Sequence, residues 1–168
     1  MSGTSDEGAC VSLTLSFEPL AEQIASLRSA ISDLCAPHIA AADELSRLLL
    51  ASHEMLENIV KYSAGGAAEF QLALERADHG LLIRLRTKNR ALPERLRDTK
   101  QRLDALAAAA DPVAHYDEMI RESAGRRDGS GLGLARILAE SEMTLRYQIE
   151  SEVLTIIAEA LISGRGRP

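Results

Sequence analysis

The order of apolar and polar positions near the start of the chain predicts one strand and two helices. Residues Val11 to Phe17 alternate between apolar and polar, which is typical of a half-buried strand. Residues 19–35 carry apolar side chains three or four positions apart, which predicts a helix that Pro37 ends. A longer helix is predicted for residues 41–63. The apolar positions of the first helix are Leu20, Ile24, Leu27, Ile31 and Leu34.

Two pairs of strands are predicted further along the chain. Residues 67–76 and 80–87 form the first pair, because the link Ala77-Asp78-His79 between them is typical of a hairpin. Residues 143–151 and 153–162 form the second pair, joined by a tight turn.

The stretch between the two hairpins, residues 89–128, has helical patches and no strand pattern. Leu92, Leu96, Leu103 and Leu106 can share one apolar stripe there, and Pro112 breaks the helical pattern. We interpret this stretch as a lid-like insert. The glycine run Gly129 to Gly133 follows it and opens a helix over residues 132–141.

This order of elements predicts an α+β fold, a two-layer sandwich of a mostly antiparallel sheet packed against helices. It excludes the regular strand–helix alternation of a Rossmann fold. We expect a disordered tail over residues 1–9, a single domain over residues 10–163 and a loose tail over residues 164–168.

Composition and charge exclude several classes of partner. The net charge of -6 argues against binding to nucleic acid or to an anionic membrane. Aromatic residues are only 3% of the chain, too few for base-stacking platforms. No apolar run is long enough to span a membrane, and no signal-peptide pattern opens the chain, so we expect a cytoplasmic protein. Cys10 and Cys35 match no metal-ligand spacing and are expected to be free thiols, with a lone disulfide as the alternative.

One face of the helix predicted at 41–63 carries candidate chemistry. At about 100° per residue, Glu54, Asn58 and Lys61 fall within about 60° of one another, opposite the apolar residues of that helix. An amide oxygen beside a carboxylate is a ligand set suited to Mg²⁺. The alternative is that this polar face is simply solvated.

The glycine run is the second candidate. Gly129, Gly131 and Gly133 alternate with Ser130 and Leu132, so the backbone can approach a phosphate just before the N-terminus of a helix. The spacing fits neither a dinucleotide-binding fingerprint nor a P-loop. The alternative is a tight connection with no ligand.

Together, in this order, the two segments resemble the N box and the second glycine box of the GHKL (histidine kinase-like) ATPase superfamily. The resemblance spans residues 11–162 and implies a Bergerat-type fold that binds ATP and Mg²⁺. It implies that Glu54 is the catalytic base and Asn58 the Mg²⁺ ligand. It further implies nucleotide contacts from five residues in these two boxes, namely Lys61, Gly129, Gly131, Leu132 and Gly133.

The first glycine box of that superfamily is degenerate here. It should fall at residues 87–91, but the adenine-recognising aspartate and both glycines are missing. Loss of a hydrogen bond to a charged group weakens ATP binding by roughly ten- to hundred-fold, and Thr87 or Asn89 would substitute in part. The altered box and the Leu-rich insert resemble the branch of anti-sigma-factor kinases and SiaB-type protein kinases.

The resemblance implies a serine/threonine protein kinase that acts on a small regulatory protein in a partner-switching pathway. The alternative is a non-catalytic interaction module of the same fold that grips a small protein or a sigma factor, with weak nucleotide binding or none. A homodimer is compatible with both hypotheses. Intact Glu54 and Asn58 favour the kinase, whereas the degenerate first box favours the module.

Overall fold

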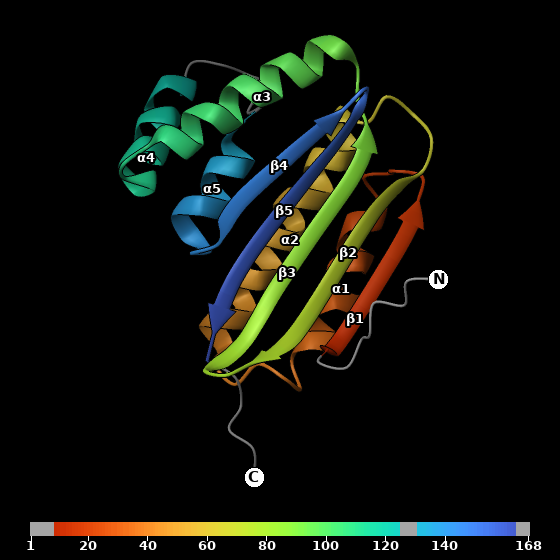
Figure 1. Ribbon diagram of the computed structural model, residues 1–168, viewed down its shortest axis with the longest axis vertical. Helices are drawn as coiled ribbons and strands as arrows, with labels where there is room; N and C mark the ends of the chain where they lie inside the picture. Colours follow the sequence, from red (N-terminus) through yellow and green to blue (C-terminus); the bar gives the residue numbers. More distant parts are fainter. Residues whose placement is uncertain (1–8, 125–130, 164–168) are drawn as a thin grey trace.

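A computed structural model describes residues 9–124 and 131–163 of the chain. Within these residues, five strands form one antiparallel sheet in the order β1-β2-β3-β5-β4 (Figure 1). The strands are β1 (Ala9–Phe17), β2 (Ala68–Ala77), β3 (Gly80–Arg90), β4 (Thr144–Glu150) and β5 (Val153–Ile162).

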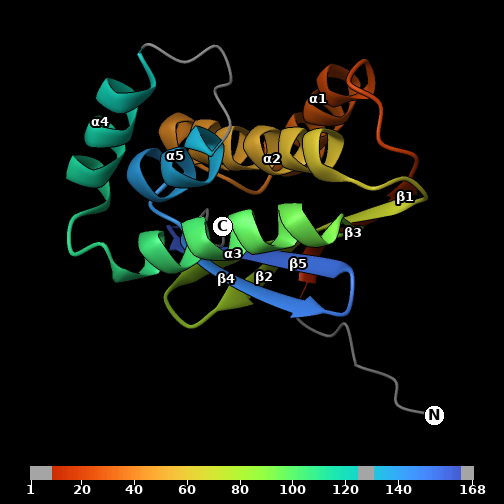
Figure 2. The same ribbon diagram turned by 90° about the horizontal axis from the view of Figure 1, so that it is seen from above.

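Helices cover one face of this sheet. The described residues form α1 (Gln23–Cys35), α2 (Ala42–Tyr62), α3 (Pro93–Ala108), α4 (Pro112–Ser123) and α5 (Leu132–Glu140). Figure 2 shows α1, α2 and α5 on the same side of the sheet, with α3 alongside β4 and α4 beyond α5. The predicted α+β fold, a two-layer sandwich of an antiparallel sheet and helices, is therefore confirmed.

Both hairpins form where the sequence predicts them. The pairing of β2 with β3 ends at Ala77 and Gly80, so the two residues between them, Asp78 and His79, form the turn. β3 runs to Arg90, three residues beyond its predicted end, because β5 pairs with it over that whole length. Asn89 therefore lies within the sheet, opposite Leu154, and the prediction that the insert begins at residue 89 is wrong.

The start and the apolar stripe of α1 differ from the prediction. The helix begins at Gln23 rather than at residue 19, and Leu20 lies in the turn before it with 44% of its surface exposed. Leu34 is 42% exposed, whereas Ile31 and Cys35 are buried. Because each residue turns by about 100°, Cys35 takes the inward position at the end of the helix and Leu34 is rotated away from it.

The insert is folded as two helices. Leu96, Leu103 and Leu106 of α3 are buried as the predicted stripe requires, while Leu92 precedes the helix and is exposed. Pro112 interrupts the helical pattern, as predicted, and it also begins α4. Proline is favoured in the first turn of a helix because the backbone N–H groups there have no partner within the helix, so its missing N–H costs nothing. The Asp111 carboxylate accepts hydrogen bonds from the next two free amides, Val113 and Ala114.

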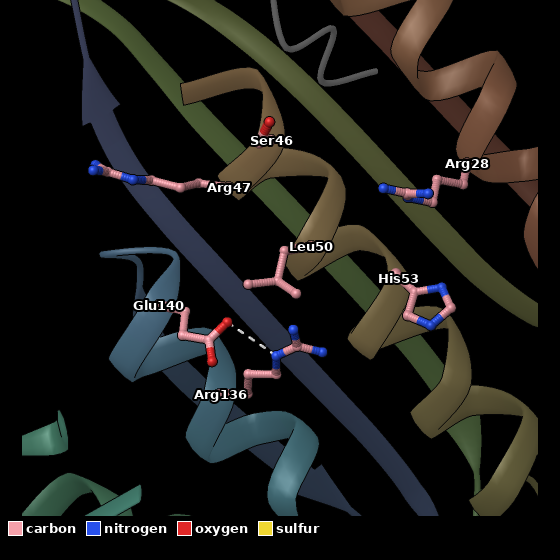
Figure 3. Close-up of a pocket in the computed structure, with 7 residues that line it drawn as sticks. All are labelled: Arg28, Ser46, Arg47, Leu50, His53, Arg136 and Glu140. Atoms are coloured by element: carbon pink, nitrogen blue, oxygen red, sulfur yellow. Dashed lines mark hydrogen bonds and ion pairs between the residues drawn. The ribbon is translucent and has the colours of Figure 1, made fainter. Parts of the chain in front are cut away.

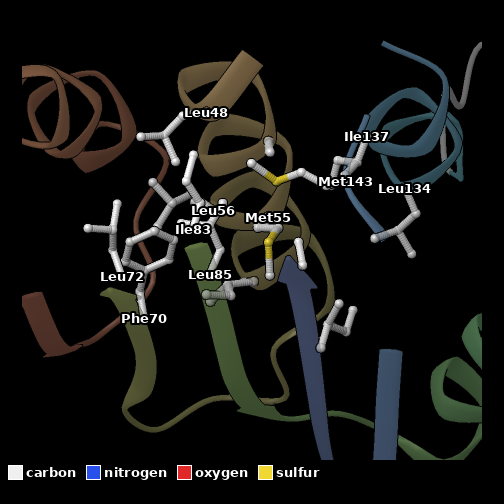
Figure 4. Packing of buried hydrophobic residues seen from close by; sticks show 14 of the residues in the cluster. Leu48, Met55, Leu56, Phe70, Leu72, Ile83, Leu85, Leu134, Ile137 and Met143 are labelled. Carbon is white, nitrogen blue, oxygen red and sulfur yellow. The ribbon is translucent and has the colours of Figure 1, made fainter. Parts of the chain in front are cut away.

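The core lies between the sheet and α2 and consists mainly of aliphatic side chains. Figure 4 shows Phe70 and Leu72 of β2 and Ile83 and Leu85 of β3 against the inward residues of α2. Alternate residues of each strand point into this layer, which follows from the two-residue period of a strand. Both cysteines are free thiols, and burial raises the pKa of Cys35 to about 11, so this thiol is unreactive at neutral pH.

The opposite face of the sheet carries a cross-strand charge network. The Arg84 guanidinium on β3 lies 2.6 Å from the Glu159 carboxylate on β5 and 3.0 Å from the Glu75 carboxylate on β2. Arg146 on β4 also contacts Glu159. The Glu159 carboxylate thus links its own strand, β5, to the neighbouring strands β3 and β4. The hydrogen bond from Arg84 is the main reason that the pKa of Glu159 lies below its ordinary value of 4.5.

We expect this network to stabilise the fold above about pH 4.5 and to fail in acid. Because the pKa of Glu159 is lower in the folded state, its contribution is fully present above the unfolded value and lost as the pH falls through the folded value. Glu159→Gln should therefore lower the urea midpoint at neutral pH and have a smaller effect at about pH 3. Glu118→Gln, an exposed carboxylate with no ion pair among the described residues, is the control and should have little effect at either pH.

Candidate functional site

The predicted polar face of α2 is covered rather than solvated at its centre. Glu54 is 9% exposed because α5 packs against this part of α2. The alternative that this polar face is simply solvated therefore does not hold at Glu54, since the helix has neighbours on two sides. Asn58, one turn further on, is half-buried and faces the sheet and α3.

The Lys61 side chain does not lie together with those of Glu54 and Asn58. Its ammonium group lies 2.7 Å from the carboxylate of Glu57, one turn back on the exposed side of α2. The hydrogen bond from Lys61 is the main cause of a lowered pKa at Glu57. In this conformation Lys61 contributes to the surface of the helix and not to the cavity beside Asn58.

The start of α5 closes on Glu54. Gly131 precedes the helix with a φ of +103°, a left-handed conformation that strains any other residue. At Gly133, an added Cβ would lie 2.5 Å from Glu54 Oε2, so any larger residue would have to displace the end of the Glu54 side chain from its present position. The turn therefore accounts for the glycine at Gly131, and close packing on Glu54 accounts for the glycine at Gly133.

Arg136 on α5 holds the Glu54 carboxylate. Its Nη1 donates to Glu54 Oε1 over 3.1 Å, and its Nε donates to Glu140 Oε2 over 3.0 Å. The pKa of Arg136 is raised, mainly by the hydrogen bond to Glu140 and also by the one to Glu54. The ion pair fixes the orientation of Glu54 in a partly buried position, where charge pairs are screened less by water.

A small cavity lies beside Asn58 and brings together residues from five parts of the chain, namely α2, β3, α3, the start of α5 and β5. Thr87 and Asn89 on β3 are 3% and 6% exposed and line it from the sheet, and Gly131 lines it from the start of α5. Thr99 and Arg102 of α3 close the remaining side. The apolar and aromatic part of the lining consists of Ile59, Tyr62, Leu134, Leu154 and Ile156.

In this conformation α3 closes the cavity. Its volume is about 20 Å³, room for about one water molecule, whereas ligand pockets are typically about 300–1,000 Å³. Arg102 reaches the glycine turn, since its Nη1 would lie 2.6 Å from a Cβ at Gly131. Arg95 over the Tyr62 ring and a hydrogen bond from Tyr147 to Asp104 also hold α3 in place. A nucleotide would therefore require α3 to move.

The residues around the cavity nevertheless include polar and charged groups that could contact a nucleotide. The Asn58 Nδ2 atom is buried and has no hydrogen-bond partner among the described residues, which is costly for an amide. Thr87 and Asn89 add further polar groups at the buried end, and Arg102 adds a positive charge beside the glycine turn. Such a set of groups can hold a polar, negatively charged ligand.

The structure places most of the predicted site residues together. Asn58, Thr87, Asn89 and Gly131 share the cavity, and Glu54 and Gly133 meet beside it. Leu132 begins α5 and is half-buried, whereas Gly129 lies outside the described residues. Sequence reasoning missed Arg102 and Arg136, because a lone arginine on a helix carries no signal of the partner it meets in space.

Comparison with known proteins shows the fold. No protein-family profile matches this chain, and no curated protein matches it in sequence. A solved structure with the same α+β fold is found, at a TM-score of 0.63 and 18% sequence identity over 93% of this chain and 92% of the other. It is a chain in the crystal structure of the SiaB–SiaC complex from Pseudomonas aeruginosa.

Two further features of the described residues bear on possible partners. None of their helices combines the length and the hydropathy that crossing a bilayer requires. Within the same residues, no three His, Cys, Asp or Glu side chains cluster as a metal site. A Mg²⁺ ion held by Asn58 would therefore depend on oxygens of the nucleotide as well, as is usual for this ion.

Proposed function

We propose that the chain is an ATP-binding regulatory domain that phosphorylates a serine or threonine of a small partner protein in a partner-switching pathway. The observation that carries the proposal is the side-chain amide of Asn58, which lies between the polar residues of β3 and the glycine turn. Its buried Nδ2 has no partner among the described residues and can donate to a phosphate oxygen, while its carbonyl oxygen is the atom that would hold Mg²⁺. The similar fold of a chain in the SiaB–SiaC complex supports a protein as the partner.

Each residue has a distinct task in this proposal. The Asn58 amide would hold Mg²⁺, Thr87 and Asn89 would contact the base, and Gly131, Leu132 and Gly133 would present backbone amides to the phosphates. Bound Mg²⁺–ATP would supply the γ-phosphoryl group and leave as ADP, and the Mg²⁺ ion would neutralise part of the phosphate charge. Glu54 accepts the proton of the acceptor hydroxyl, and Arg136 keeps its carboxylate oriented.

A second candidate function is a non-catalytic module that grips a small protein or a sigma factor. Two observations favour it: the closed cavity beside Asn58, and the absence of an aspartate in the first glycine box. A homodimer remains compatible with both candidates. Nucleotide binding separates them, since the module needs none.

We expect Mg²⁺–ATP to raise the melting temperature of the protein. Ligand binding to the folded state at a hundredfold excess over Kd adds about 2.7 kcal/mol, which is about 5–10 °C for a chain of this length. Arg102→Gln should weaken binding about tenfold, because the guanidinium beside Gly131 can pair with phosphate oxygens. At the same ATP concentration the shift should fall to about half.

Arg97→Gln is the matched control for this measurement. Arg97 lies on the same helix, α3, is exposed and does not line the cavity, so its variant should keep the full ATP-induced shift. If ATP produces no shift in the wild-type chain, the kinase is ruled out and the non-catalytic module is favoured. Equal shifts in both arginine variants and the wild type would remove Arg102 from the phosphate site.

A further inference from the structure

The sheet has an open edge at β1. Among the described residues β1 pairs only with β2, so the backbone groups along its outer side have no strand neighbour (Figure 1). The strand carries no charged side chain and no proline, and the irregularity in its pairing falls between Ala9 and Val11. Natural sheets usually protect such an edge with charges, prolines or bulges, because an open edge can pair with another strand. From Val11 to Phe17, β1 has none of these devices.

The strand at the other edge of the sheet, β4, is protected. It has seven residues against nine in β1, and it exposes the charged side chains of Arg146 and Glu150. Helix α3 also lies alongside it, and the Tyr147 hydroxyl on β4 donates a hydrogen bond to Asp104 on α3. The two edges of the sheet therefore differ, and β1 is the edge that is suited to pairing with another strand.

The apolar layer between the sheet and the helices is also left partly open along β1. The side chains of β2 that face the helices are at most 1% exposed, whereas those directly opposite them on β1 are only half-buried. The residues of β2 are Ala68, Phe70, Leu72 and Leu74, and those of β1 are Phe17, Leu15, Leu13 and Val11. A neighbour beyond β1 would remove from water the apolar surface that a single chain leaves exposed there.

Helix α1 continues this open apolar edge above β1. Figure 2 shows α1 on the same side of the molecule as β1, and Figure 3 shows Arg28 of α1 directed towards α2. At about 100° per residue, Leu27 and Leu34 are rotated by about 100–120° from Arg28. They lie beyond the buried Ile31 and so on the side of the helix that faces β1. Leu34 is 42% exposed, and Leu20, seven residues before Leu27, is 44% exposed.

We propose that β1 and α1 form the interface of a homodimer, in which β1 pairs antiparallel with β1 of a second copy. The occupant is a second copy because the edge is complementary to itself. In a two-fold pairing centred on Thr14, the middle of the regular stretch, polar residues meet polar residues and apolar residues meet apolar ones, which stabilises a sheet. The opposed pairs are Thr14 with Thr14, Ser12 with Ser16, Leu13 with Leu15 and Val11 with Phe17.

Charge supports the same occupant. Each copy has a net charge of -6, which opposes self-association in general, yet this strand places no charge opposite a like charge. Specific contact with a different protein commonly relies on opposite charges, and β1 offers none. The dimer would join two five-stranded sheets into one and bring the leucines of both α1 helices together. The cavity beside Asn58 lies nearer the opposite edge of the sheet, so the pairing leaves it uncovered in both copies.

The test is sedimentation equilibrium of the full chain over a range of concentrations, without nucleotide. We expect a monomer–dimer equilibrium. Thr14→Lys should weaken the dimer by about tenfold or more, because the two-fold axis places the two new charges opposite each other. Thr14 is exposed, so the variant should keep the fold, which circular dichroism checks. Thr144→Lys makes the same substitution at an exposed residue of β4 and should dimerise as the wild type does.

Amide hydrogen exchange locates the interface independently. Protection in β1 should fall when the wild-type chain is diluted below the dissociation constant of the dimer, while protection in β4 should not change. A chain that stays monomeric at every concentration, a Thr14→Lys dimer as stable as the wild type, or equal weakening by Thr144→Lys would each overturn the proposal. Because neither measurement needs ATP, the kinase proposal stands or falls separately, on the thermal shift with Mg²⁺–ATP.

Discussion

Replacing Glu54 with glutamine is expected to abolish measurable phosphate transfer while leaving nucleotide binding largely intact. Glutamine is nearly isosteric and can still accept a hydrogen bond from Arg136, so the packing against Gly133 is kept. What is lost is the negative charge that orients or deprotonates the acceptor hydroxyl, a contribution of typically about 10²–10⁴-fold. The measurement is radiolabel transfer from ATP to a verified partner protein, together with nucleotide affinity.

Glu57→Gln is the matched control for that experiment. Glu57 lies on the same helix but faces Lys61 and His53 at the surface, and it does not line the cavity. This variant should transfer phosphate at close to the wild-type rate. Transfer that survives in Glu54→Gln would refute the catalytic role, and loss in both variants would point to a general disturbance of α2.

The largest expected loss of stability comes from Phe70→Ala in the centre of β2. Phe70 is fully buried and is among the few aromatic side chains in a mainly aliphatic core (Figure 4). Truncating a buried phenylalanine costs about 3–5 kcal/mol, because it removes apolar contact and leaves a cavity. The melting temperature should fall by about 6–20 °C, which thermal unfolding followed by circular dichroism will measure.

Leu161→Ala provides the comparison for this substitution. Leu161 lies on β5 with 59% of its surface exposed, so its truncation should change the free energy of unfolding by less than about 0.5 kcal/mol. A Phe70→Ala variant that loses no more stability than Leu161→Ala would contradict the placement of Phe70 in the core. Comparing the two variants also distinguishes the effect of burial on stability from the general effect of truncating an apolar side chain in a strand.

The fold was predictable from local patterns because each element buries a face whose period can be seen in the sequence. The strict alternation at Val11 to Phe17 predicts β1, and the leucines of α3 predict its buried stripe. Helix ends were less predictable: Leu34 fits the spacing of α1 yet is exposed, because Cys35 takes the inward position. The extension of β3 to Arg90 depends on β5, which is distant in the sequence.

The candidate site was predictable only where residues share a segment. Asn58 and Gly131 could be assigned from motifs, and the structure brings them to one cavity. The burial of Glu54 and its pairing with Arg136 could not be predicted from motifs, because both follow from how α5 packs on α2. The same holds for Arg102, whose proximity to Gly131 results from the position of α3 over the sheet.

The pairing of β3 with β5 has a consequence for the order in which the molecule assembles. The β2–β3 and β4–β5 pairs are hairpins that close locally, but Arg90 meets Val153 only across the whole of α3, α4 and α5. Closing so long a loop has a high entropic cost, so we expect this joint to form late and to limit the folding rate. Thr87 and Asn89 line the cavity from one side of the joint and Leu154 from the other. The site is therefore completed only when the two halves of the sheet meet, which prevents partly folded chains from presenting it.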